Sequence, residues 1–199
     1  SKLLNNHKIE FSVNREFLFM CHNKRMKSHR LAVLAFLKKT NIINDVDWSF
    51  MFDSESNVDY NLSPTLKEEI EIILKNGNVK SKYEIDHVFK FGDLGDHICE
   101  DTFRNAYLNI TTETNFITED VHITEKSFKP FFFYQIPIFL SSAFHVKNLK
   151  EIYGFDLFED VVNHDYDNET NFKKRFSLVC DEINGIYNNR DEIKKFIIN

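Results

Sequence analysis

The sequence predicts an α/β domain in which helices cover both faces of a parallel sheet. Short apolar segments alternate with segments of helical apolar spacing along the chain, the order that a parallel sheet requires. Residues 136–141 are apolar without the polar alternation of a strand that has one face in water. A chain of 199 residues with 42% hydrophobic residues is long enough to bury one such core.

The predicted strands are short apolar runs, and the predicted helices are segments with apolar residues three or four positions apart. We expect strands at residues 16–22, 46–52, 106–113, 136–141 and 154–158. We expect helices at residues 30–39, 64–76, 101–104, 124–134, 144–154, 168–189 and 191–198. The second helix has Pro64 at its start and Gly77 just past its end, the usual positions of these residue types.

The chain is predicted to form one domain over residues 1–199, with 1–15 as a lead-in segment and 168–199 as C-terminal helices. No apolar run approaches the roughly 18 residues of a membrane span, and the first ten residues lack the apolar centre of a signal peptide. The three cysteines are widely spaced, which favours reduced thiols. We therefore expect a cytoplasmic protein without a transmembrane segment.

The net charge of −6 argues against broad nucleic-acid binding. Basic residues nevertheless gather at the end of one predicted strand. Five of them fall within seven positions between the first strand and the first helix: Lys24, Arg25, Lys27, His29 and Arg30. Helix N-termini carry partial positive charge, so cations are unfavourable there. A solvated basic loop is the simplest interpretation of one such run.

A second unfavourably placed cation, Lys126, lies in the first turn of the helix expected at 124–134. Ligands of parallel sheets bind beyond the carboxyl ends of the strands, and both basic positions follow such ends. Cations at two neighbouring helix N-termini become favourable when an anion lies between them. The sequence therefore predicts an anion site that uses Arg30 and Lys126.

The expected anion is a nucleoside diphosphate linked to another group. The glycine-rich phosphate loops GxGxxG and GxxxxGK[ST] are absent from the sequence, so side chains must supply the charge. Arg30 offers a planar fork and Lys126 a point charge. Glu125 adds an acceptor for hydroxyl hydrogens, such as those of a ribose.

Two stretches resemble the donor-binding motifs of α1,3-fucosyltransferases and their viral and bacterial relatives. In AYLNITTETNFITEDVHITEKSFKPFFFYQIPIFLSS, residues 106–142, a strand and a loop precede Thr-Glu-Lys at a helix start, and a strand resembling IPIFL follows. In FLFMCHNKRMKSHRLAVLAFL, residues 17–37, a strand leads through an Asn-containing loop to an arginine before a helix. The resemblance covers roughly residues 16–142.

The resemblance implies the Rossmann-like, C-terminal, nucleotide-sugar-binding half of a GT-B glycosyltransferase. It places Arg30 and Lys126 at the donor diphosphate and Glu125 at the ribose hydroxyls. Glu113 and Thr114 occupy a Glu-Asn pair that lines the donor site. Thr114 departs from the family because a hydroxyl replaces a carboxamide. Asn23, in the first loop, is a looser match.

The resemblance further implies transfer of a sugar, with fucose as the family default, from a GDP-sugar to a glycan or other hydroxyl acceptor. Inversion without a bound metal or other cofactor is expected. The acceptor and the catalytic base usually come from a first domain, so an acceptor-binding domain or partner chain is implied and the base stays unassigned. Glu119, Asp120 and His122 are the acid–base candidates near the motif. The alternative is a non-catalytic nucleotide-binding or protein-interaction module.

Other motifs carry less weight. Asp45-Val46-Asp47 and Asp165-Tyr166-Asp167 match the DxD pattern that holds divalent metals, but so short a pattern is expected by chance. The zinc-like run at 86–101 fits no regular ligand spacing, so no metal site is predicted. Pro130 leaves two possibilities open, because the helix either starts nearer Lys126 or kinks.

Overall fold

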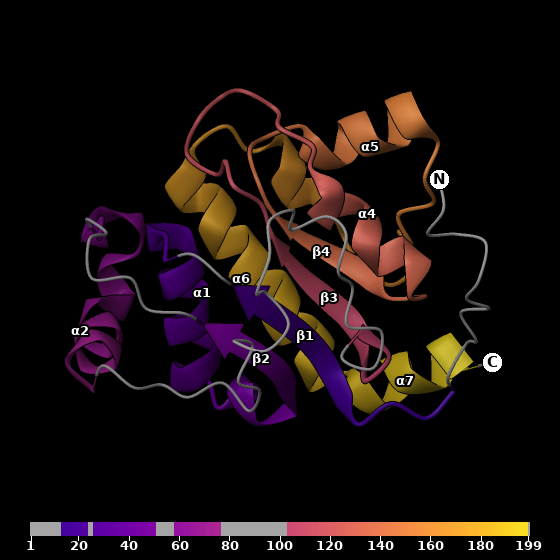
Figure 1. The fold of residues 1–199 in the computed structure, drawn as a ribbon, viewed down its shortest axis with the longest axis horizontal. Coiled ribbons are helices and arrows are strands. Elements are labelled where there is room, and N and C mark those ends of the chain that lie inside the picture. The colour runs from indigo at the N-terminus through magenta and orange to yellow at the C-terminus, as the bar shows by residue number, and fades with distance from the viewer. Residues whose placement is uncertain (1–12, 24–25, 51–57, 77–102, 199) are drawn as a thin grey trace, which may run out of the picture.

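The computed structural model describes residues 13–23, 26–50, 58–76 and 103–198. Four strands in these ranges form one parallel sheet in the order β2-β1-β3-β4 (Figure 1). The strands are β1 Phe17–Asn23, β2 Val46–Phe50, β3 Ala106–Thr112 and β4 Ile136–Leu140. Helices flank the sheet, with α4 in front and α6 behind it in Figure 1. The predicted Rossmann-like α/β class is confirmed.

The helices follow the strands in the predicted alternation. The α-helices among the described residues are α1 Ser28–Lys39, α2 Lys67–Asn76, α4 Glu125–Phe132, α5 His145–Tyr153, α6 Phe172–Asn188 and α7 Arg190–Ile198. Short 3-10 helices are η1 Ile42–Asp45, η2 Tyr60–Leu62, η3 Pro64–Leu66 and η5 Asp165–Asn168. None of the helices in this part of the chain has the length and apolar character needed to cross a bilayer.

Apolar residues that pair across the four strands form the core at the centre of the sheet. Phe19 of β1 pairs with Val46 on one side and Leu108 on the other, and Leu108 pairs with Ile136 of β4. All four side chains are buried, and every residue of β3 and β4 is buried as well. Burial of each such side chain contributes on the order of 2 kcal/mol, which explains why β4 carries no polar alternation.

Three segments differ in detail from the prediction. Residues 154–158 are not a strand, because Gly154 and Phe158 have left-handed backbone angles (φ 68° and 56°) and the chain turns there. Their aromatic side chains pack on α4 instead, with the Phe155 and Phe131 rings 4.2 Å apart at their centroids. The predicted helix at 64–76 is split between η3 and α2. The long C-terminal helix begins only at Phe172, after the Asn171 side chain accepts from the amides of the first turn.

Helix α4 keeps Pro130 inside its eight residues and starts where the Thr124 side chain caps it. Of the predicted helix at 101–104, only residues 103 and 104 are described. The predicted helix stop at Gly77 and the loop at 79–98 lie outside the described residues.

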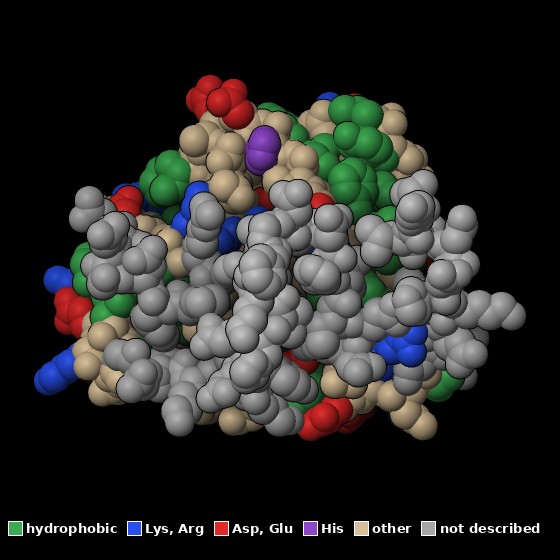
Figure 2. All heavy atoms as spheres, in the orientation of Figure 1, with side chains coloured by type: hydrophobic (Ala, Val, Ile, Leu, Met, Phe, Trp, Pro, Cys, Tyr) green, Lys and Arg blue, Asp and Glu red, His purple; other side chains and the backbone are tan. Residues whose placement is uncertain are grey.

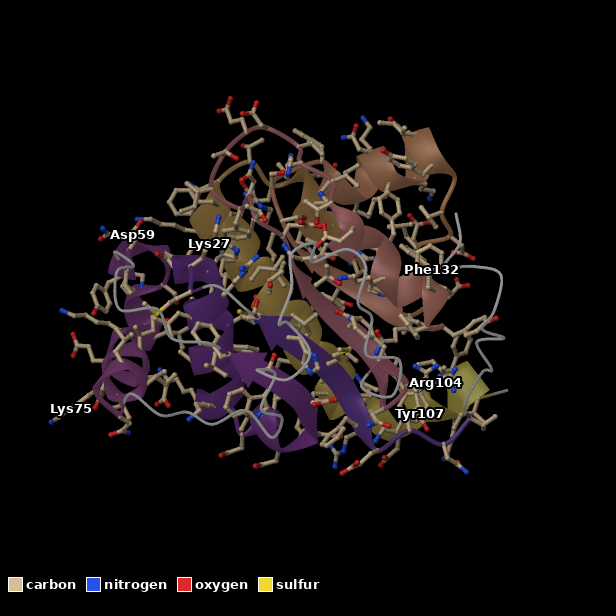
Figure 3. The ribbon with its side chains drawn as sticks, in the orientation of Figure 1. Lys27, Asp59, Lys75, Arg104, Tyr107 and Phe132 are labelled. Carbon is tan, nitrogen blue, oxygen red and sulfur yellow. The ribbon has the colours of Figure 1, made fainter. Side chains whose placement is uncertain are left out.

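The connections between the strands distinguish the carboxyl-terminal edge of the sheet. The chain leaves β1 for β2 on one side and returns to β3 on the other side of β1. The carboxyl ends of β1 and β3 therefore form a topological switch point, the usual ligand position in open parallel sheets. Figure 3 places Lys27 at this end of the molecule and Arg104 and Tyr107 at the opposite end.

Two buried charged side chains fix the loops around this edge. Asp167 accepts the Val146 and Lys147 amides, each at 3.0 Å, and so fills the N-terminus of α5. Arg175 of α6 donates to the carbonyl of Ser141 at 3.0 Å and to the carbonyl of Phe116. The guanidinium also lies 4.9 Å from the centre of the Phe116 ring.

We expect Asp167→Ala to lower the free energy of unfolding by about 2 kcal/mol, because a buried and a partly buried first-turn amide of α5 lose their acceptor. Urea denaturation followed by circular dichroism measures the change. Asp165→Ala is the matched control, since Asp165 is exposed and its carboxylate contacts the Asn163 side chain. Equal losses in the two variants would show that the Asp167 cap is not what stabilises α5.

Candidate functional site

Helix α1 begins with basic residues that point to the end of β3. Its N-cap residue, Lys27, makes no side-chain capping bond, and no acidic residue lies in the first turn. The guanidinium of Arg30 donates through Nη2 to the Thr112 carbonyl at 3.2 Å and approaches the Glu113 carbonyl at 3.4 Å. Arg30 is only 4% exposed, so its charge is held inside the edge of the sheet.

Cations from two helices meet at the same short piece of backbone. The Lys27 ammonium donates to the Thr114 carbonyl at 2.8 Å, and the Lys126 ammonium donates to the Thr114 hydroxyl at 3.2 Å. The pKa of Lys126 is lowered by burial and then by the charge of Arg30. The positive charges are therefore close enough to disfavour one another. Figure 2 shows Lys and Arg side chains recessed at the upper end of α1, where Figure 3 labels Lys27.

Glu113 holds α4 in place from inside the protein. Its carboxylate is fully buried and accepts the Ser127 hydroxyl at 2.5 Å and the Thr124 hydroxyl at 2.8 and 3.0 Å. Thr124 in turn accepts the Lys126 amide at 3.3 Å. The Glu113 side chain, expected to line the donor site, is therefore directed into the protein and contacts the start of α4.

The remaining site residues predicted from the sequence differ in accessibility. Asn23 is buried, accepts the Thr112 hydroxyl and donates to the Cys21 sulfur at 3.4 Å. Thr114 is half-buried between the two lysines, and Glu125 is exposed in the first turn of α4. Arg30, Lys126, Thr114 and Glu125 therefore share one edge, while Asn23 supports it from within. Lys24 and Arg25 lie outside the described residues.

The three helix N-termini at this edge differ in what fills them. Asp167 occupies the start of α5, and the Thr124 hydroxyl caps α4. Helix α1 has basic side chains at its start, its N-cap residue makes no side-chain capping bond, and its first turn contains no acidic residue. Helix N-termini favour anions, so α1 is the one of these three best suited to a phosphate group.

A hollow of about 320 Å³ opens beside the start of α1. Its lining combines apolar and polar side chains from two segments: Met26, Lys27, Ser28, His29, Thr114, Asn115, Phe116, Ile117 and Thr118. Lys27, His29 and Thr114 were expected from the sequence at this edge, and residues 115–118 were not. Their position just after a predicted strand end was the signal that could have identified them.

The acid–base and metal candidates take other positions. Glu119, Asp120 and His122 are exposed in the loop between β3 and α4. Asp45 accepts the Leu18 amide at 2.8 Å, and Asp167 serves α5, so both DxD motifs contribute a carboxylate to backbone capping. In the described ranges, no group of three or more His, Cys, Asp or Glu side chains could hold a metal ion. The run at 86–101 lies entirely outside the described residues.

Comparisons with protein-family models, with curated proteins and with solved structures gave no match to this chain. The geometry of the switch-point edge and the motif resemblance are therefore the observations that bear on function.

Two histidines at this edge are held neutral. His29 is 4% exposed, and burial together with the charge of Arg30 lowers its pKa to about 3. His145, at the start of α5, lies 2.9 Å from the Ser127 hydroxyl through Nε2, and burial lowers its pKa to about 4. Because the Ser127 hydroxyl donates to Glu113, His145 is the donor in this pair.

We expect Glu113→Gln to lower the free energy of unfolding by about 2 to 3 kcal/mol, because an amide places a donor against two buried hydroxyl donors. Urea denaturation measures the loss. Glu125→Gln, an exposed position on the neighbouring turn, should change stability by less than about 0.5 kcal/mol. A loss for Glu113→Gln no larger than this control would contradict the positioning role.

We expect stability to fall as the pH drops from 7 to 5. The folded pKa values of His29 and His145, about 3 and about 4, lie below the ordinary value of 6.5, so the unfolded chain binds protons first. Each histidine then costs roughly 2 kcal/mol at pH 5. Urea denaturation at several pH values measures the slope, and His145→Gln should reduce it. A flat profile between pH 7 and 5 would count against the two neutral histidines.

Proposed function

We propose that this chain binds a nucleoside diphosphate sugar at the switch point between β1 and β3. It would serve as the donor-binding domain of a glycosyltransferase of the fucosyltransferase-like GT-B type. The observation that carries the proposal is the convergence of Lys27, Arg30 and Lys126, from two helices, on residues 112–114. These cations repel one another and are partly removed from water, and a bound anion would offset both unfavourable effects.

The chemistry of a nucleotide-sugar fits these groups. Transfer of the sugar to a hydroxyl acceptor leaves charge on the diphosphate, and fixed cations beside a helix N-terminus stabilise that charge as it develops. Glu125, exposed at the start of α4, is placed to accept ribose hydroxyl hydrogens. The hollow beside α1 offers apolar and polar walls for the base or the sugar.

The acceptor side of the reaction needs a further contributor. Glu119, Asp120 and His122 are exposed on the loop between β3 and α4. We therefore assign the acceptor site and the base to another domain or a partner chain. A binding module that holds the nucleotide without transferring the sugar is the second candidate function.

We expect GDP to raise the melting temperature by about 5 to 10 °C at a hundred times its Kd, since such saturation adds about 2.7 kcal/mol. A thermal-shift panel of GDP, UDP, CMP and ADP measures the response and the base preference. Absence of a shift with every nucleotide would overturn both candidate functions.

Lys126→Ala should weaken GDP binding about tenfold, because a charge-assisted bond to the diphosphate is lost. The ligand-free protein should melt at an unchanged or slightly higher temperature, since a half-buried ammonium is removed. Lys147→Ala is the matched control: Lys147 also lies in a first turn at this edge, but Asp167 fills that helix N-terminus. Equal weakening by both variants would contradict a direct role for Lys126.

Hydrolysis of the sugar donor distinguishes the two candidate functions, an active transferase domain and a non-catalytic binding module. Slow release of GDP from GDP-fucose or another GDP-sugar, lost in Lys126→Ala, supports an active transferase domain. Binding of GDP without turnover, with or without added acceptor hydroxyls, supports the module instead.

A further inference from the structure

His29 stands in the wall of the hollow at the start of α1, among cations. Its ring stacks on Phe116 with centroids 5.3 Å apart, and Arg175 lies over the same Phe116 ring at 4.9 Å. The side chain is 4% exposed, yet it contributes to the lining of the hollow. Its orientation is therefore fixed by packing before any ligand arrives.

The contact of His29 with Glu113 decides its tautomer. Nε2 lies 2.9 Å from the Glu113 carbonyl oxygen, which can only accept a hydrogen bond. Nε2 must carry the hydrogen, and Nδ1 of the neutral ring then carries a lone pair and acts only as an acceptor. Burial and the charges of Arg30, Lys27 and Lys126 keep the pKa of the ring far below neutrality.

The neighbours of His29 have the opposite hydrogen-bonding character. Lysine and arginine side chains donate and cannot accept, so Lys27, Arg30 and Lys126 suit phosphate oxygens. Nδ1 of His29 offers a lone pair that repels a phosphate oxygen and attracts an O–H or N–H group. The same edge thus presents donors for an anion and, in His29 Nδ1, an acceptor for a neutral donor group next to it.

We propose that His29 determines specificity by accepting, through Nδ1, a hydrogen bond from a hydroxyl or amino group of the bound nucleotide. This inference depends on the proposed function, because it names a feature of the ligand at the same site. It predicts preference for ligands that carry a donor group close to the diphosphate over inorganic anions of equal charge.

Calorimetric titration of the wild type and His29→Phe tests the proposal. The probes are GDP, 2′-deoxy-GDP, 3′-deoxy-GDP, inosine diphosphate, which lacks the guanine amino group, and inorganic pyrophosphate. We expect one donor-deleted analogue to bind the wild type about tenfold more weakly than GDP. In His29→Phe, which keeps the ring stacking, that ratio should fall to about one, while pyrophosphate binds both proteins equally. The affected analogue identifies the donor as a ribose hydroxyl or the base amine.

The same ratios in wild type and His29→Phe for every analogue would overturn the role of His29 and leave nucleotide binding intact. Failure of every nucleotide to bind the wild type would instead overturn the proposed function on which the inference rests. Long-range nitrogen NMR of the wild type gives a measurement that needs no folded variant. We expect an unprotonated His29 Nδ1 whose resonance moves on saturation with GDP and not with pyrophosphate. A protonated or unresponsive Nδ1 would also overturn the proposal.

Discussion

The arrangement of this edge depends on Glu113, which joins two helices to the end of β3. Its buried carboxylate accepts the hydroxyls of Thr124 and Ser127 in α4 and its cap, and its backbone carbonyl meets His29 and Arg30 of α1. A buried carboxylate is tolerated only when hydrogen bonds satisfy it. The bonds that satisfy Glu113 are thus the same bonds that set the relative position of the two helix N-termini.

The charges near that junction are unfavourable for the stability of the ligand-free protein. Lys126 and Arg30 disfavour one another, and the start of α1 has basic residues where an acid or a capping hydroxyl would be stabilising. The neighbouring N-terminus of α5 shows the stabilising solution, with Asp167 in place. Local rules broken at one edge and obeyed beside it mark a functional region.

The fold was predictable because periodicity and order along the chain constrain a parallel sheet strongly. The uniformly apolar run at 136–141 and the alternation of elements were sufficient. The same logic located Arg30 and Lys126 at one edge. The direction of each side chain was not predictable: a motif gives the position of Glu113 but not its inward orientation. Residues 154–158 have strand-like composition, and only their left-handed backbone angles and their packing on α4 decide otherwise.

Arg175 connects helix α6 to the loop that lines the hollow. Its guanidinium donates to the carbonyls of Ser141 and Phe116. It therefore links α6 to the end of β4 and to the loop that carries Phe116, on which the His29 ring stacks. Several α6 side chains, among them Lys173, Ser177 and Leu178, face outward. Phe176 of α6 also contacts the Phe116 ring, so a displacement of α6 would move the wall of the hollow as well.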